Sequence, residues 1–142
     1  PERGHRWLDP LCRGGVVLGA FAESFMIKPT GLETRLDWAE ISAGYLSRFD
    51  GASVGLWDGG SIPYADDSFD GLFSQLSKRF RKFNYRLQSE FHRVLNKHGR
   101  AIVVCDRDRN LESGHGLFKC VERRPLYIRG EALFLYQLRK SS

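Results

Sequence analysis

Short apolar runs alternate along the chain with segments in which apolar residues recur every three or four positions. The runs predict strands at residues 6–9, 32–37, 52–57, 69–76 and 101–105. The helical spacing predicts helices at 16–25, 41–49 and 80–95, with breaks at Pro29-Thr30-Gly31 and His98-Gly99. Residues 117–124 and 132–138 predict a final antiparallel hairpin. Single helices between strands predict a three-layer α/β domain with a mainly parallel sheet.

An acidic residue stands at or next to the end of each of the first three predicted strands. Ligands of parallel sheets bind at the carboxyl ends of the strands, where these side chains would lie. Asp37 could accept hydrogen bonds from ribose hydroxyls, Trp38 offers a flat surface for a base, and Asp58 could accept from an exocyclic amine. The glycines between Asp9 and Gly15 would let a ligand approach the backbone at a helix N-terminus. The alternative is that each acid is a helix cap or a solvated turn residue.

Composition narrows the class of protein. A chain of 142 residues is enough for one domain, and 42% hydrophobic with 27% charged residues excludes wholesale disorder. No run approaches the roughly 18 apolar residues that a membrane helix needs. The charge is uneven, because residues 1–76 hold 6 Lys and Arg against 11 Asp and Glu, whereas residues 77–142 hold 16 against 6. This uneven distribution of charge indicates either two surfaces that bind different kinds of partner or a basic face that is only solvated.

Cysteine and histidine positions predict neither a disulfide framework nor a metal site. Three scattered cysteines favour a reducing compartment, such as the cytoplasm or an organelle matrix. The four histidines have no ligand spacing with them or with one another. Because the first residue is Pro1 rather than methionine, we expect residues 1–142 to form one domain of a fragment or processed form of a longer protein.

Three segments carry a combined pattern. Residues 58–70 read D-G-G-S-I-P-Y-A-D-D-S-F-D, residues 90–100 read E-F-H-R-V-L-N-K-H-G-R, and residues 8–15 read L-D-P-L-C-R-G-G. They resemble D-x-x-x-L-P-F-x-D-x-S-F-D, E-x-x-R-V-L-K-P-G-G and L-D-L-G-C-G-T-G of the class I S-adenosylmethionine-dependent methyltransferases. The resemblance extends over nearly the whole chain, and it implies a seven-stranded Rossmann-like sheet with an antiparallel C-terminal hairpin.

The resemblance also implies a cofactor, S-adenosylmethionine, and roles for individual residues. Asp37 would hold the ribose hydroxyls, and Asp58 would meet the adenine amine with the Gly59 amide beside it. Gly15 and the Asp9 region would bracket the methionine part. Ser74 and Gln75, at the end of the fourth strand, would face donor and substrate. The predicted cofactor-binding residues are therefore Asp9, Gly14, Gly15, Asp37, Trp38, Asp58, Gly59 and Ser74.

The glycine-rich segment departs from the family pattern. Leu11 and Arg13 stand where the family has its first two glycines. A side chain at either position could fill the cofactor space or require a backbone angle that non-glycine residues avoid. The leading hypothesis is an S-adenosylmethionine-dependent methyltransferase domain of unknown acceptor. The alternative is an inactive methyltransferase-like subunit or scaffold, which could be associated with RNA.

Methyl transfer needs positioning of donor and acceptor more than a catalytic dyad. His115, in the loop after the fifth strand, is the candidate base, although the sequence leaves the catalytic residue open. After the fourth strand, Lys78, Arg79, Arg81 and Lys82 alternate with phenylalanines and could bind RNA or an acidic partner. The alternative is that the phenylalanines are core and the cations are solvated.

Overall fold

The computed structural model describes residues 3–76, 85–106, 116–128 and 130–141. Strands and helices alternate through the first two thirds of this part of the chain. The order is β1 (Arg6–Asp9), α1 (Val16–Phe25), β2 (Lys28–Glu33), α2 (Leu36–Leu46), β3 (Ser53–Leu56), β4 (Phe69–Leu76), α3 (Tyr85–Val94), β5 (Leu95–Cys105), β6 (Phe118–Ile128) and β7 (Glu131–Lys140).

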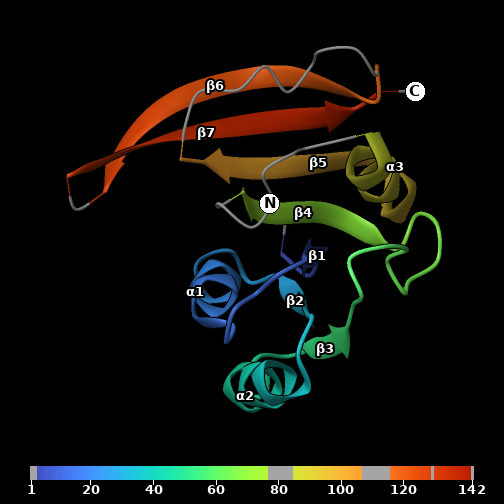
Figure 1. Ribbon diagram of the computed structural model, residues 1–142, viewed down its shortest axis with the longest axis vertical. Helices are drawn as coiled ribbons and strands as arrows, with labels where there is room; N and C mark the ends of the chain where they lie inside the picture. The colour runs from blue at the N-terminus through green and yellow to red at the C-terminus, as the bar shows by residue number, and fades with distance from the viewer. Residues whose placement is uncertain (1–2, 77–84, 107–115, 129, 142) are drawn as a thin grey trace.

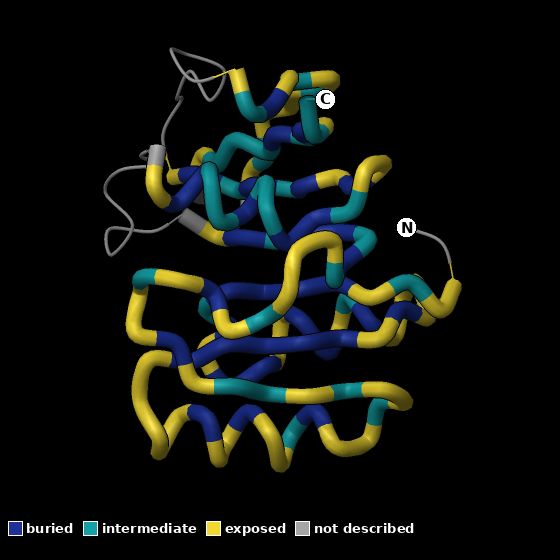
Figure 2. The backbone as a smooth tube through the Cα atoms, turned by 90° about the vertical axis from the view of Figure 1, so that its right-hand side faces the viewer, coloured by how far each residue is buried: buried dark blue, intermediate teal, exposed yellow. Residues whose placement is uncertain are grey.

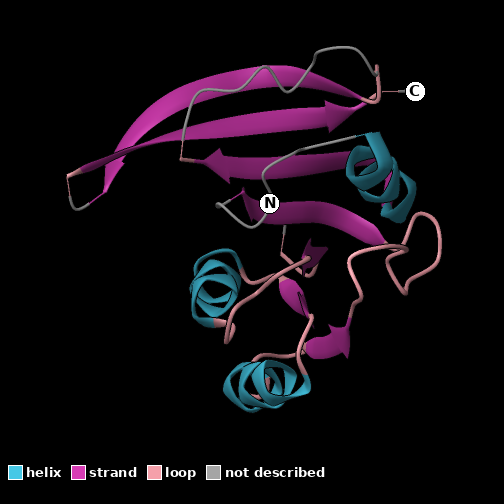
Figure 3. Ribbon diagram, viewed as in Figure 1, coloured by secondary structure: helices cyan, strands magenta, loops and turns pink. Residues whose placement is uncertain are grey.

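The strands form one seven-stranded sheet in the order β3-β2-β1-β4-β5-β7-β6 (Figure 1). Neighbours from β3 to β5 are parallel, and β7 pairs antiparallel with both β5 and β6. The secondary-structure colouring in Figure 3 shows the helices flanking this sheet. The predicted α/β class, with a mainly parallel sheet and an antiparallel C-terminal hairpin, is confirmed.

The two faces of the sheet carry separate parts of the core. Leu8, Leu72 and Val103 pack in one cluster with Phe91 of α3. Trp7, next to Leu8 in β1, packs on the other face with residues of α1. Because successive strand residues point to opposite faces, this division produces three layers. Figure 2 shows the result, with buried backbone along the inner strands and exposed backbone along the turns.

The second strand lies four residues earlier than the sequence predicts. The segment Pro29-Thr30-Gly31, predicted to break a helix, forms the middle of β2. The Lys28 amide donates to His5 O at 2.8 Å, so the Pro29 nitrogen points away from β1, toward the side of β3. Pairing with β3 starts only at Thr30, opposite Ser53. The missing N–H of Pro29 therefore costs no ladder bond.

The third helix also ends earlier than predicted. It stops at Val94, and β5 begins at Leu95 instead of Ala101. Gly99, predicted as the helix cap, lies inside β5, where the register with β4 shifts between the pairs Phe69–Leu95 and Gly71–Arg100. Glycine is common at strand irregularities of this kind and also at helix C-caps. Gly99 alone therefore could not show which of the two structures it belongs to.

Replacing each of two glycines by alanine should change the free energy of unfolding in opposite directions. A Cβ on Gly71 of β4 would overlap the indole ring of Trp7, whereas one on Gly44 of α2 would meet nothing within 4 Å. We expect Gly71→Ala to lower the free energy of unfolding by about 3 kcal/mol through overpacking. Gly44→Ala should raise it by about 0.5–1 kcal/mol through helix propensity. Urea denaturation of both variants tests this, and similar changes in both would contradict the packing described.

Candidate functional site

The loops after β1, β2 and β3 meet at one edge of the sheet and line two neighbouring pockets that are open to solvent. One pocket, of about 250 Å³, is lined by Arg13, Glu33, Thr34, Arg35 and Trp38. The other, of about 380 Å³, is lined by Thr34, Leu36, Leu56, Trp57, Asp58, Ser61 and Pro63. Thr34 belongs to both, so the pockets adjoin at the end of β2. This is the carboxyl edge at which parallel sheets bind ligands.

Glu33 is the acidic residue that ends β2. Its side chain is 3% exposed and lines the smaller pocket. Its Oε1 accepts hydrogen bonds from the Gly14 amide at 3.2 Å, Ser42 Oγ at 3.3 Å and Cys12 Sγ at 3.4 Å. These three donors come from the loop after β1 and from α2, so they fix the carboxylate between two elements.

The loop after β1 turns sharply into α1. Gly14 and Gly15 have φ of 83° and 85°, which favours glycine at both positions. Arg13 adopts φ 45° without being glycine, a conformation that costs of order 1 kcal/mol. A Cβ on Gly14 would lie 3.2 Å from the ring of Trp38, so the indole rests directly on this loop. Leu11 is half-buried, and its amide donates to Asp9 Oδ1 at 3.1 Å.

Asp9, at the end of β1, is buried, and its carboxyl group has a raised pKa. Its pKa is raised from 3.8 to about 7, chiefly by burial and to a smaller extent by the nearby charge of Glu33. The Leu11 amide and the positive charge of Arg13 oppose this increase. Asp9 therefore titrates near neutral pH at the base of the loop.

Asp9 should make the stability of the protein fall as pH rises. The unfolded chain releases the proton near pH 3.8 and the folded protein near pH 7, so the folded state binds more protons between these values. The free energy of unfolding should decrease across this window by up to about 4 kcal/mol and stay level above it. Asp9→Asn should remove this decrease and be the more stable protein at about pH 8. Denaturant titrations of the wild type and of Asp9→Asn at a series of pH values measure the free energy of unfolding. If it changed with pH in the same way in both proteins, the raised pKa of Asp9 would be contradicted.

The loop between β3 and β4 forms the wall of the larger pocket. Asp58 is exposed, and its Oδ1 accepts from the Gly60 amide at 2.8 Å. The buried Trp57 donates from Nε1 to Gly60 O at 3.1 Å. Gly59, between them, has φ 89°. The carboxylate of Asp58 is thus held at the pocket by a tight turn.

Arg93 of α3 holds the loop between β3 and β4 by hydrogen bonds to several of its residues. Its guanidinium donates to Ile62 O and Tyr64 O, both at 2.8 Å, and to Asp66 Oδ1 at 3.0 Å. Glu90 pairs with Arg93 at 2.8 Å and accepts from the Ile62 amide at 2.6 Å. These bonds lower the pKa of Glu90, the Arg93 pairing being the larger cause, and raise that of Arg93. The two motif segments, 58–70 and 90–100, are therefore joined directly.

Comparison with solved structures reveals the same architecture elsewhere. The chain superposes with a TM-score of 0.83 on a structure from the complex between the Haloferax volcanii Trm112 methyltransferase activator and a candidate methyltransferase, at 14% identity, over 100% of this chain and 84% of that chain. The superposition on an S-adenosylmethionine-dependent methyltransferase from Aquifex aeolicus has a TM-score of 0.76 at 12% sequence identity. It covers 99% of this chain and 84% of that chain. The chain has the fold of the class I methyltransferases. The [4+2]-cyclase SpnF is similar as well, with a TM-score of 0.78 at 16% sequence identity. That superposition covers 98% of this chain and 76% of that chain. The sequence matches no protein-family model and no curated protein.

One predicted residue stands elsewhere in this methyltransferase fold. Asp37 was expected to end β2, but it lies in the first turn of α2, is 57% exposed and pairs with Arg35 at 2.7 Å. It lines neither pocket at the carboxyl edge. That prediction of its place is wrong, because β2 extends from Lys28 to Glu33 and leaves Asp37 beyond it. The residue that the sequence analysis missed is Glu33, and the local signal was weak, since Leu32 is the single large apolar residue between Lys28 and this acid.

The other predicted residues divide into three groups. Trp38 and Asp58 line one pocket each, Asp9 ends β1, and Gly14, Gly15 and Gly59 belong to the loops beside the pockets. Ser74 is buried near the end of β4, and Gln75 beside it is exposed. His115 and the basic residues Lys78, Arg79, Arg81 and Lys82 lie outside the described residues.

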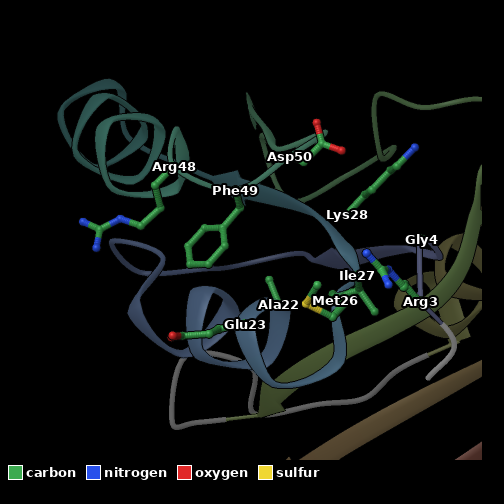
Figure 4. Close-up of a pocket in the computed structure, with 10 residues that line it drawn as sticks. All are labelled: Arg3, Gly4, Ala22, Glu23, Met26, Ile27, Lys28, Arg48, Phe49 and Asp50. Carbon is green, nitrogen blue, oxygen red and sulfur yellow. The ribbon is translucent and has the colours of Figure 1, made fainter.

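A further pocket, of about 370 Å³, lies at the opposite edge of the methyltransferase-like sheet (Figure 4). It is bounded by the last turn of α1, the start of β2 and the end of α2. Figure 4 shows the ring of Phe49 pointing toward Ala22 of α1. No residue predicted as a site lines it. Ligands of this fold are expected at the other edge, so this pocket is not part of the candidate site.

Two other features are absent from the described residues, a metal-ligand cluster and a membrane-spanning helix. Among the described residues, no three His, Cys, Asp or Glu side chains gather as metal ligands would. In the same part of the chain, no helix has the length and apolar character to cross a membrane.

Proposed function

We propose that the chain binds S-adenosylmethionine at the carboxyl edge of β1, β2 and β3 and is a methyltransferase whose acceptor is unknown. The observation that supports this most is the pair of adjoining pockets, with a buried carboxylate at the end of β2 in one and Asp58 in the other. A nucleoside needs both, since ribose hydroxyls and an exocyclic amine are hydrogen-bond donors.

The residues present fit each part of the molecule. Glu33 would accept from the ribose hydroxyls. Leu36, Leu56 and Pro63 give the larger pocket apolar walls for adenine, with Asp58 placed to accept from its amine. Arg13 lines the smaller pocket, where its charge would attract the carboxylate of the methionine part and oppose the sulfonium.

When bound, S-adenosylmethionine would supply an activated methyl group for in-line displacement and would leave as S-adenosylhomocysteine. The residues of this chain then have to orient the donor and exclude water rather than supply covalent chemistry. Glu33 and Asp58 would hold the nucleoside at two points, which fixes its direction. Gln75, exposed at the end of β4, would face the acceptor side, and His115 remains the proposed base.

Calorimetric titration with S-adenosylmethionine and S-adenosylhomocysteine tests the proposal. Both should bind the folded protein at one site, and adenosine should bind more weakly because it lacks the methionine part. Absence of heat with both ligands at high concentration would contradict cofactor binding. If binding is found, transfer of a radiolabelled methyl group into RNA, protein or small-molecule fractions of a cell extract would identify the acceptor class. Binding without any transfer would favour the alternative of an inactive subunit.

Restoring the family glycines distinguishes an adapted site from an obstructed one. In Leu11→Gly plus Arg13→Gly, the strain at Arg13 is relieved but the half-buried Leu11 side chain is lost. If the site is adapted to these side chains, we expect a less stable protein with little or no gain in affinity. The comparison is made by calorimetry and thermal melting. Undetectable binding by the wild type together with measurable binding by the double variant would contradict a working site.

A further inference from the structure

Three basic residues stand side by side across the last three strands. In the register of the sheet, Arg100 of β5 is opposite Arg139 of β7, and Arg139 is opposite Lys119 of β6. We call these three residues the cationic row. All three are exposed. Neighbouring strands lie about 4.8 Å apart, so the row spans about 10 Å of the sheet surface.

The cationic row lies on the face opposite α3. Its neighbours along the strands, Ala101, Phe118 and Leu138, are buried in the cluster that contains the α3 residues. Because side chains alternate between faces, Arg100, Lys119 and Arg139 point to the other side. On that other side, α1 and α2 cover β1 to β3, and Phe21 of α1 also stacks on Phe73 of β4. The strands β7 and β6 form the end of the sheet farthest from α2 (Figure 1).

Like charges directly opposite one another in a sheet are destabilising, typically by a few tenths to about 1 kcal/mol for each pair. Among the described residues, none of the three forms an ion pair. On the same face, Glu122 pairs with Arg124 and so does not neutralise the row. Within the described part of the chain, the sheet thus holds three positive charges at fixed spacing with no acidic side chain paired to them.

Partly exposed apolar side chains continue from the row on the same face. Val104 of β5 is opposite Leu135 of β7, and both are partly exposed, whereas Ile102, between Arg100 and Val104 on this face, packs in part against the cluster of Trp7 and Ala22. Gln137 is opposite Ile102 and adds an amide. Cations beside an apolar strip match a chain that has phosphates along one side and bases along the other.

We propose that this face of β5, β7 and β6 binds a single strand of nucleic acid, with the cationic row on neighbouring phosphates. An acidic protein segment would satisfy the charges but makes no use of the apolar strip and the amide beside them. The surface is separate from the cofactor pockets, so this proposal does not depend on the proposed methyltransferase activity.

Fluorescence anisotropy with a labelled oligouridylate, over a range of salt concentrations, tests the proposal. The variant Arg100→Gln, Lys119→Gln, Arg139→Gln should bind about tenfold more weakly at low salt. The slope of log affinity against log salt should fall by about 2, because three phosphate contacts on a single strand are lost. Its thermal stability should be equal to or above that of the wild type, since the repulsion is removed.

The matched control removes three positive charges elsewhere: Arg48→Gln, Lys97→Gln, Arg123→Gln. Arg123 lies in β6 over the Phe134 ring, on the face opposite the row. This control should keep most of the affinity and of the salt slope. Equal weakening in both triple variants would overturn the proposal, as would no binding by the wild type at low salt. Equally tight binding of polyglutamate would also overturn it and indicate an acidic protein partner.

Discussion

Glu33→Gln is expected to weaken binding of S-adenosylmethionine by about 2 kcal/mol, roughly 30-fold, the scale of a hydrogen bond to a charged group. Because Glu33 Oε1 accepts from three donors, the glutamine oxygen should take its place. The amide NH₂ then replaces the other carboxylate oxygen, and the negative charge is lost. The nucleoside should lose an acceptor for its ribose hydroxyls while the loop after β1 keeps its anchor. Calorimetric titration gives the affinity, and thermal melting checks that the variant is folded.

Asp37→Asn is the matched control for this experiment. Asp37 has the same charge, lies four residues away and is exposed in α2 beside Arg35. Its replacement should leave the affinity nearly unchanged and affect stability little, since exposed ion pairs contribute little. The opposite result, with weak binding in Asp37→Asn and normal binding in Glu33→Gln, would show that the acid suggested by the sequence pattern is the one that binds ribose.

Arg93→Met should be the variant that destabilises the protein most through a polar contact. The guanidinium side chain is only 28% exposed, and Glu90 beside it is 16% exposed. Removing Arg93 takes away the partner charge of Glu90 and the guanidinium bonds to the carbonyls of Ile62 and Tyr64. Glu90 then keeps the Ile62 amide as a donor but has no cation beside it. We expect a loss of about 3 kcal/mol in the free energy of unfolding, measured by urea denaturation. Affinity for S-adenosylmethionine should also fall, because the loop that carries Asp58 is no longer fixed.

The control for Arg93 is Arg124→Met. Arg124 pairs with Glu122, but the two side chains are 64% and 42% exposed. Its removal should change the stability by less than about 0.5 kcal/mol. If both variants lost the same amount, the contribution of Arg93 would come from its charge or its aliphatic part rather than from its bonds to the loop.

Some parts of the fold could be predicted closely from the sequence. The bounds of α1 and β4 agree with prediction, because an amphipathic face and a continuous apolar run are local signals that neighbouring elements reinforce. The motif segments 58–70 and 90–100 were also identified together. The structure gives the reason, since Arg93 and Glu90 hold the loop that contains Ile62 and Tyr64.

Other parts depended on neighbours that are distant in the sequence. Pro29 and Gly31 indicate a turn by local propensity, yet β1 pairs with both positions and makes them a strand. That shift placed the end of β2 at Glu33 and put Asp37 in α2, outside the lining of both pockets. The cationic row was equally invisible, because Arg100, Lys119 and Arg139 become neighbours only through the register of the C-terminal strands. The sequence by itself determined the class of fold and the order of its strands and helices, since hydrophobic periodicity and motif spacing are local. Only the tertiary structure decided which carboxylate faces the pocket and which charges share a surface, since both depend on strand pairing.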